Sequence, residues 1–215
     1  MIPWLGDSHT FPEHHTASPD GLLAVGGDLN PERILAAYRL GIFPWFNEEQ
    51  PPLWWSPDPR MVLIPQHFAP KKSLRKTLKH THYEIRYNSA FSQVIHHCAN
   101  TPRRGRLGTW LTDEMKHAYG QLFQMGYAHS VETWEGETLV GGLYGIRMGK
   151  VFFGESMFSH RTDASKIAFA NLIQKLQEND IQLLDCQVYS DHLASLGASE
   201  IPRDTFLTLL KQWIP

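Results

Sequence analysis

Cysteine is scarce in this chain of 215 residues, which contains only Cys98 and Cys186. Their spacing fits neither a zinc knuckle nor a redox CxxC pair, so we expect two unpaired thiols in a reducing compartment. No apolar run approaches the ~20 residues that are needed to cross a bilayer. The N-terminal stretch MIPWLGDSHTFPEHH also has neither the basic nor the apolar region of a secretory signal. We therefore expect a cytoplasmic protein that does not enter the membrane.

Acidic residues are nearly missing from one segment of a chain whose formal net charge is only −2. Between Lys71 and Arg106 there are nine lysines and arginines and a single acid, Glu84, so nine minus one gives a local charge of +8. The overall charge argues against a nucleic-acid partner, whereas a basic face on this segment would suit a polyanion. A solvated helix face is the ordinary explanation of such a run. Charge alone leaves both interpretations open.

The order of the expected elements indicates an α+β protein with two parts. Residues 1–62 form a small N-terminal α/β domain, with a helix that begins after Asn30 and the aromatic, Pro-rich loop GIFPWFNEEQPPLWWSPDPR. Residues 63–215 include a basic helix in PKKSLRKTLKH and three antiparallel strands in YAHSVETWEGETLVGGLYGIRMGKVFFGESMFS. A helix in TDASKIAFANLIQKLQEND and the strand IQLLDCQVY follow. Meander, helix and strand in this order form the core of an acetyltransferase-like (GNAT-type) mixed sheet.

Glycine is absent from SMFSHRTDASK, the stretch that corresponds to the Gly-rich turn of enzymes with this fold that bind acyl-CoA. In those enzymes, backbone N–H groups of the turn hold a pyrophosphate at a helix N-terminus. Asp163 would repel a phosphate at this position. The stretch therefore favours an acyl donor other than CoA. A CoA-dependent N-acetyltransferase and a non-catalytic RNA-binding module are the two rival interpretations.

The strand in LLDCQVYSDHLASLGASE carries polar residues on one of its faces. Side chains alternate along a strand, so Asp185 and Gln187 are expected on the same face, opposite an apolar one. Such a face is either solvated or the floor of a site, and the pattern does not decide between them. Glu155, in GESMF, lies on the strand that we expect beside it. A carboxylate there suits a cationic amine or a surface salt bridge.

The blocks GIFPWF, WWSPDPR, GGLYG, GESMFS, ASK and DCQV..DH.ASLGA.EIPR together resemble the leucyl/phenylalanyl-tRNA–protein transferases of bacteria. They run from about Gly21 to Arg203, in one order and at compatible spacing. The resemblance implies an enzyme that moves leucine or phenylalanine, and methionine more weakly, from aminoacyl-tRNA to the α-amine of proteins that begin with Arg or Lys. The product would be marked for degradation by the N-end rule. An aminoacyl ester is already activated, so neither a metal nor CoA nor another cofactor is expected. We also expect a monomer.

The resemblance also implies roles for individual residues. Asp185 and Gln187 match a catalytic relay in which Asp185 polarises Gln187 and Gln187 contacts the attacking amine. A glutamine is a poor base, so we favour orientation and electrostatics, with the ribose hydroxyl of the donor as a candidate proton shuttle. Glu155 is placed in the active site. The positions that match the pocket for the donor side chain are Leu143, Phe152, Phe169 and Leu172. Those that would stack on the terminal adenosine are Tyr38, Trp45 and Trp110. The expected contacts to tRNA phosphates are Lys71, Lys72, Arg75, Lys76, Arg103 and Arg104.

Overall fold

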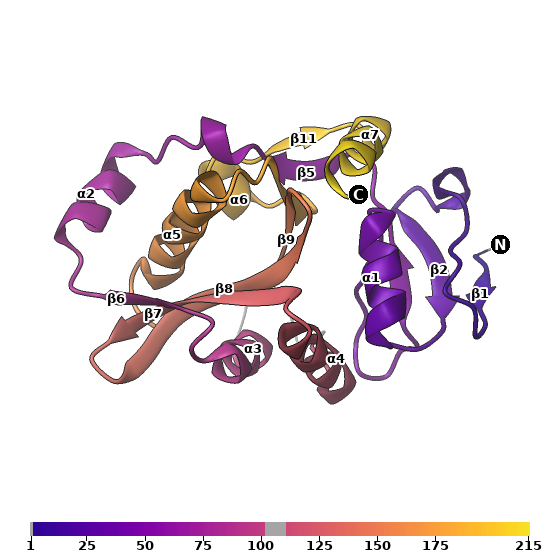
Figure 1. The fold of residues 1–215 in the computed structure, drawn as a ribbon, viewed down its shortest axis with the longest axis horizontal. Helices are drawn as coiled ribbons and strands as arrows, with labels where there is room; N and C mark the ends of the chain where they lie inside the picture. The colour runs from indigo at the N-terminus through magenta and orange to yellow at the C-terminus, as the bar shows by residue number, and fades with distance from the viewer. Residues whose placement is uncertain (1, 102–110) are drawn as a thin grey trace.

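The computed structural model describes residues 2–101 and 111–215 and contains two β-sheets (Figure 1). The smaller sheet lies at one end of the molecule and has four strands in the order β1-β2-β4-β3. β1 runs parallel to β2, and the other neighbours are antiparallel. The elements of this part are β1 (Trp4–Leu5), η1 (His14–Thr16), β2 (Leu22–Gly26), α1 (Pro31–Arg39), β3 (Phe43–Pro44) and β4 (Leu53–Trp55).

The larger sheet has seven strands in the order β11-β5-β10-β9-β8-β7-β6. The strands β7, β8 and β9 form the antiparallel meander that the sequence predicts, and β10 lies parallel to β9 after a helical crossover. The α+β fold class, with a small N-terminal sheet and a larger mixed sheet, is thereby confirmed. Its strands are β5 (Arg60–Leu63), β6 (Glu84–Tyr87), β7 (Ala128–Glu135), β8 (Thr138–Met148), β9 (Val151–Ser159), β10 (Leu183–Gln187) and β11 (Ser199–Ile201).

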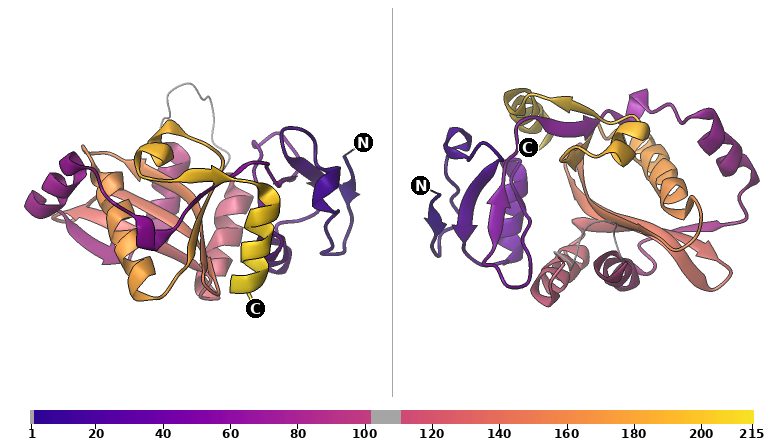
Figure 2. Two further views of the ribbon diagram at one scale, coloured as in Figure 1. Left: turned by 90° about the horizontal axis from the view of Figure 1, so that it is seen from above. Right: turned by 180° about the vertical axis from the view of Figure 1, so that it is seen from behind.

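Helices cover both faces of the larger sheet (Figure 2). α5 packs on one face, against a buried cluster that includes Val131, Leu143 and Phe152, while α3 and α4 pack on the other, near Tyr144 and Phe153. The helices of this part are η2 (Pro65–His67), α2 (Lys72–His80), α3 (Phe91–Asn100), α4 (Asp113–Gln124), α5 (Ala164–Glu178), α6 (Asp191–Ser195) and α7 (Arg203–Trp213). None of the helices in the described ranges is long and apolar enough to cross a membrane.

The chain passes from the smaller sheet to the larger one between Trp55 and Arg60. β5 contains the boundary expected at residues 62/63, and it pairs with β10 and β11 in the larger sheet. One hydrophobic cluster contains residues of both parts, among them Trp54 and Phe153. The two sheets therefore share a core, and the division into two domains at residue 62 stays a prediction.

Local signals account for the ends of several helices. The Asn30 side chain accepts a hydrogen bond from the Glu32 N–H at the start of α1, where the sequence predicts a helix. Thr112 in the same way accepts from the Met115 N–H at the start of α4. The first serine in YNSAFSQVIHHCA suggests a cap at Ser89, but α3 begins one residue later than such a cap would place it, at Phe91, with Ala90 before it. Ser89 instead donates its N–H and hydroxyl to Glu132. The fold thus uses this serine to pair a carboxylate that is fully buried.

Candidate active site

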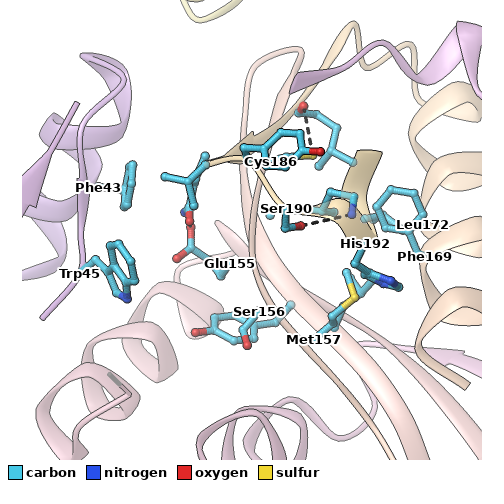
Figure 3. Close-up of a pocket in the computed structure, with 18 of the residues that line it drawn as sticks. Phe43, Trp45, Glu155, Ser156, Met157, Phe169, Leu172, Cys186, Ser190 and His192 are labelled. Carbon is cyan, nitrogen blue, oxygen red and sulfur yellow. Dashed lines mark hydrogen bonds between the residues drawn. The ribbon is translucent and has the colours of Figure 1, made fainter. Parts of the chain in front are cut away.

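A cavity of about 400 Å³ opens where the smaller sheet meets β9, β10 and α5 (Figure 3). Trp45, the residue after β3, lies on one side of it, and Phe169 and Leu172 of α5 lie on the other, with Glu155 between them in the view of Figure 3. Gln187, at the end of β10, also lines it. The expected site residues that line this cavity are Trp45, Leu143, Glu155, Phe169, Leu172 and Gln187.

Gln187 points into the cavity because β10 is irregular at its end. The register between β10 and β5 shifts between Asp185 and Gln187, and Gln187 has a φ of +64°. A non-glycine residue in this left-handed region costs roughly 1–3 kcal/mol. The Asp185 Oδ1 holds it there by accepting the Gln187 backbone N–H at 2.9 Å. The Gln187 Nε2 then donates to the Glu155 Oε1 at 3.1 Å.

This bulge corrects the expectation that Asp185 and Gln187 share one open strand face. Asp185 has no solvent exposure and does not line the cavity. Its carboxylate contacts the backbone of Gln187 and not the carboxamide. The expected relay, in which Asp185 polarises the Gln187 side chain directly, therefore does not fit the contacts. Asp185 is instead placed to hold the backbone of Gln187.

The partner of Asp185 is Arg60, a residue to which the sequence alone assigns no role. Arg60 donates from Nε to Oδ1 at 2.8 Å and from Nη2 to Oδ2 at 2.7 Å, and both residues are at most 1% exposed. The guanidinium carbon lies 4.7 Å from the ring centres of both Phe43 and Phe206. A bidentate pair between stacked rings fixes both the distance and the plane of the carboxylate. The sequence feature that could have pointed to Arg60 is its position at the end of WWSPDPR, directly before the apolar run MVL, where a charged side chain is unexpected.

Glu155 is surrounded by hydrogen-bond donors in the wall of the cavity. Tyr38 donates to Oε1 at 2.6 Å, Tyr119 donates to Oε2 at 2.7 Å, and the two hydroxyl groups lie 2.7 Å apart. Burial raises the pKa of Glu155 from its ordinary value of 4.5 to about 7. The hydrogen bonds from Tyr38, Tyr119 and Gln187 lower this pKa, and the negative charge of Asp185 raises it further. At neutral pH this carboxyl group therefore exchanges between its two protonation states.

The stacking residues expected from the resemblance differ in how they are placed. The ring of Tyr38 is fully buried and packs 4.9 Å from Phe153, so no face is open to a base. Tyr38 does not line the cavity itself, and its hydroxyl is linked to it only through the hydrogen bond to Glu155. Trp45 is half-buried, lines the cavity and lies 5.8 Å from the ring of Trp55. Trp110 lies outside the described residues, as do Arg103 and Arg104.

We call the cavity wall formed by Leu143, Phe169 and Leu172 the donor slot, after the donor side chain that the resemblance implies it would hold. All three are buried in one cluster on the α5 face of the sheet. Phe152 belongs to the same cluster but does not line this cavity; it lines a second cavity behind the slot. The side chain next to Phe152 along β9, Phe153, points to the opposite face. Phe152 therefore supports the slot from behind.

The basic helix α2 is set apart from the cavity. It packs on α5 through its buried Leu74, at the opposite end of the molecule from the smaller sheet (Figure 1). The four expected phosphate contacts that the structure describes are all exposed, and none takes part in an ion pair within residues 2–101 and 111–215. They are Lys71, Lys72, Arg75 and Lys76.

Solved structures resemble the chain only remotely. A functionally unknown conserved protein from Staphylococcus epidermidis has a TM-score of 0.43 and 9% identity, covering 84% of this chain and 68% of that one. The structure of L-PGS from Bacillus licheniformis has a TM-score of 0.42 and 11% identity, covering 75% of this chain and 54% of that one. Neither likeness bears on the chemistry of the cavity.

Similarity in sequence is much closer. The family model described as leucyl/phenylalanyl-tRNA protein transferase matches residues 62–211, and the model of its N-terminal domain matches residues 27–58. A leucyl/phenylalanyl-tRNA–protein transferase from Dechloromonas aromatica is 58% identical over 208 residues, which cover 96% of this chain and 89% of the relative. One from Nitrosospira multiformis is 54% identical over 216 residues, which cover 100% of this chain and 93% of the relative. The predicted family and activity are thus confirmed: the chain belongs to the leucyl/phenylalanyl-tRNA–protein transferases and is an enzyme that transfers leucine or phenylalanine from tRNA to protein.

Proposed function

We propose that transfer takes place in the cavity between Trp45, Glu155 and the donor slot. The leucyl or phenylalanyl side chain enters the slot, the terminal adenosine of the tRNA stacks on Trp45, and the acceptor amine approaches Glu155 and Gln187. The observation that carries this proposal is the position of Glu155. A carboxyl group with a pKa of about 7, hydrogen-bonded to Gln187, stands in the same cavity as an apolar slot and an aromatic ring.

Glu155 is the group best suited to take a proton from the acceptor. A peptide α-amine has a pKa of about 7.7–8.0, so proton transfer from its ammonium form to Glu155 is nearly balanced in free energy. The neutral amine then attacks the ester carbonyl carbon and the bond to the ribose oxygen breaks. The attacking nitrogen gives up a second proton as the amide forms, and the ribose oxygen takes that proton and leaves as a hydroxyl. The Gln187 Nε2 is engaged by Glu155, so its carbonyl oxygen is the part that orients the amine.

Arg60 and Asp185 act through Gln187 and touch no reacting atom. Together they hold the backbone of Gln187 in its left-handed conformation. Tyr38 and Tyr119 orient the Glu155 carboxylate in the same way. We propose these four as positioning residues, which revises the role of Asp185 and Tyr38 that the resemblance implies.

The acceptors are proteins that begin with Arg or Lys, and methionine is a weaker donor. A carboxylate at the reaction centre suits a cationic acceptor. A slot of branched and aromatic residues discriminates by only ~1–3 kcal/mol for one methylene, which admits methionine. The product is marked for degradation, and the enzyme works as a monomer in the cytoplasm without CoA. Asp163 supports the absence of a role for CoA. This residue caps the N-terminus of α5, where a pyrophosphate would bind, and its carboxylate pairs with Lys166 at 2.7 Å.

The direct test mixes the purified chain, tRNA charged with leucine or phenylalanine, and a peptide that begins with Arg. Mass spectrometry should show that the peptide gains one leucine or phenylalanine. The control peptide is identical but acetylated on its α-amine, and it should gain nothing. Addition to the acetylated peptide, or no addition to either, would contradict the proposed acceptor group.

Reversing the charge of the α2 cations is expected to weaken tRNA binding and to flatten its salt dependence. Each phosphate contact contributes ~0.7–0.9 to the slope of log K against log salt. Changing Lys71, Lys72, Arg75 and Lys76 to Glu should therefore lower the magnitude of the slope by up to about 3–4. A filter-binding titration over several salt concentrations measures it. The control reverses four basic residues outside α2: Arg39, Lys116, Lys150 and Lys211. A slope that stays unchanged in the α2 variant would place the tRNA elsewhere.

A Trp45→Ala variant is expected to raise the KM for aminoacyl-tRNA. Stacking on an aromatic ring contributes ~1–3 kcal/mol per base, which corresponds to roughly 5- to 150-fold. Steady-state kinetics at saturating peptide measure this change. Trp4→Ala is the matched control, because Trp4 is 70% exposed on β1 and does not line the cavity. Equal KM values in the two variants would remove Trp45 from the adenosine site.

A further inference from the structure

A second cavity, of about 220 Å³, lies on the same face of the larger sheet as the donor slot. It is lined by the end of β6, the start of β7, the end of β8, the start of β9 and the C-terminal half of α5. Figure 1 shows α5 lying across these strands. The cavity is smaller than the ~300–1,000 Å³ of sites for drug-sized ligands, so its ligand would be small.

The rim of the second cavity is cationic. Arg147 and Lys175 line it from β8 and α5, and no carboxylate is among the described residues that line it. Arg147 is exposed and forms no ion pair within the part of the chain that the structure describes. Lys175 lies 3.4 Å from Glu178 and 5.9 Å from the centre of the Tyr87 ring, which also lines the cavity. At least one positive charge is therefore available to a ligand at this rim.

The floor of the second cavity is apolar. Val131, Phe152, Leu172, Leu176 and Ile181 contribute to it, and each is at most 5% exposed. Water gains few hydrogen bonds on such a floor, so covering it with an apolar group is favourable. A cationic rim above an apolar floor matches a molecule that has a negative charge at one end and a hydrocarbon body at the other.

We propose that the second cavity binds a small organic anion, a monocarboxylate with an aromatic or branched aliphatic body. The carboxylate pairs with Arg147, which can bind it through two parallel N–H groups, and with Lys175. The body of the ligand lies on Phe152, Leu172 and Leu176. This site is separate from the cavity of the transfer reaction, because neither cation lines that cavity.

The second cavity and the donor slot share a wall. Leu172 lines both cavities, and Phe152 packs in one cluster with Leu143 and Phe169 of the slot. Protein interiors are packed too densely to absorb a displaced side chain without moving its neighbours. A ligand pressed against Leu172 and Phe152 therefore changes the shape of the slot and shifts the preference between leucine and phenylalanine. This consequence rests on the proposed function of the slot, whereas binding itself does not.

The binding test titrates 3-phenylpropionate into the full-length chain by isothermal calorimetry. We expect a millimolar Kd that becomes at least tenfold weaker in an Arg147→Gln/Lys175→Gln double variant and with the neutral isostere 3-phenylpropanol. Arg39→Gln/Lys211→Gln is the control with the same loss of charge, and it should bind like the wild type. Affinity that survives the Arg147 and Lys175 substitutions would overturn the proposal, even if the probe binds in the donor slot. So would equal binding of the alcohol, or no binding.

The coupling test measures transfer from leucyl- and phenylalanyl-tRNA in competition, with and without saturating 3-phenylpropionate. The ratio of the two products should shift at least twofold in the wild type and stay constant in the Arg147→Gln/Lys175→Gln variant. If the ratio of leucine to phenylalanine product in the wild type does not change with the probe, the shared wall does not couple the two cavities. A chain that binds the probe but transfers neither amino acid would contradict the proposed function and leave the binding result intact.

Discussion

An Arg60→Met variant is expected to lose about 3–5 kcal/mol of folding stability and nearly all transfer activity. The substitution leaves the Asp185 carboxylate, which has no solvent exposure, without its bidentate partner. A buried charge whose partner is removed keeps its desolvation cost and loses the attraction that offset it. The midpoint of thermal unfolding should fall by roughly 6–20 °C, at ~2–4 °C per kcal/mol for a chain of this size. Circular dichroism and initial transfer rates measure the two effects.

The Arg60→Met/Asp185→Leu double variant separates stability from positioning. Replacing a buried ion pair by apolar residues of similar volume is often neutral for stability or favourable, so the unfolding midpoint should recover. Transfer should not recover, because the Gln187 N–H loses the Oδ1 that holds it at a φ of +64°. The rate constant kcat should fall more than KM for the tRNA rises, since Trp45 and the donor slot are untouched. Recovery of both stability and activity would show that the pair serves the fold alone.

Arg33→Met is the matched control for the loss of a buried arginine. Arg33 is also fully buried, and it bonds to Asp28 and to the carbonyl oxygens of Gly6 and Ser8, within the smaller sheet's side of the molecule. Its replacement should lower the unfolding midpoint and leave kcat close to that of the wild type below that midpoint. If kcat falls equally in the Arg33 and Arg60 variants, the loss of activity in Arg60→Met is explained by its lower stability alone.

The pairing of Arg60 with Asp185 also shows where inference from the sequence ends. The starts of α1 and α4 follow from Asn30 and Thr112, because a cap is a contact between residues two or three positions apart. The meander follows from alternation and tight turns within one continuous stretch. Arg60 and Asp185 lie 125 positions apart and meet only because β5 enters the sheet beside β10. No local pattern in either segment indicates that neighbour.

For the same reason, only part of the candidate site could be predicted from the sequence. Regular alternation places Asp185 and Gln187 on one face, but a bulge is a property of two paired strands and not of one sequence. The acidic residue of GESMF could be placed near the site. Its pKa, however, is raised by burial and lowered by hydrogen bonds from Tyr38 and Tyr119, which come from two helices in different parts of the chain. Burial of a tyrosine was predictable from helix periodicity; the direction of its hydroxyl was not.

A Glu155→Gln variant is expected to be inactive and, above neutral pH, more stable than the wild type. The folded protein holds the pKa of Glu155 at about 7, above its ordinary value of 4.5, chiefly because the group is desolvated. Between these values the folded state binds a proton that the unfolded state releases. Stability therefore falls as pH rises through this window, by about 1.4 kcal/mol for each unit of difference in pKa. The carboxamide of the variant carries no charge at any of these pH values, so the unfolding midpoints of the two proteins should agree near pH 4 and diverge by pH 8.

The wild-type transfer rate should rise with pH through about 7, as Glu155 loses its proton and can accept one from the acceptor. The α-amine of the peptide titrates at about 7.7–8.0, so the profile alone does not assign the group. Tyr119→Phe resolves this ambiguity. Tyr119 donates to Oε2 at 2.7 Å and thereby lowers the pKa of Glu155. Its loss should move the rising limb of kcat to higher pH, while the peptide amine is unchanged. If the rising limb of the kcat profile lies at the same pH in Tyr119→Phe as in the wild type, the titrating group is the peptide amine, and Glu155 is not the base.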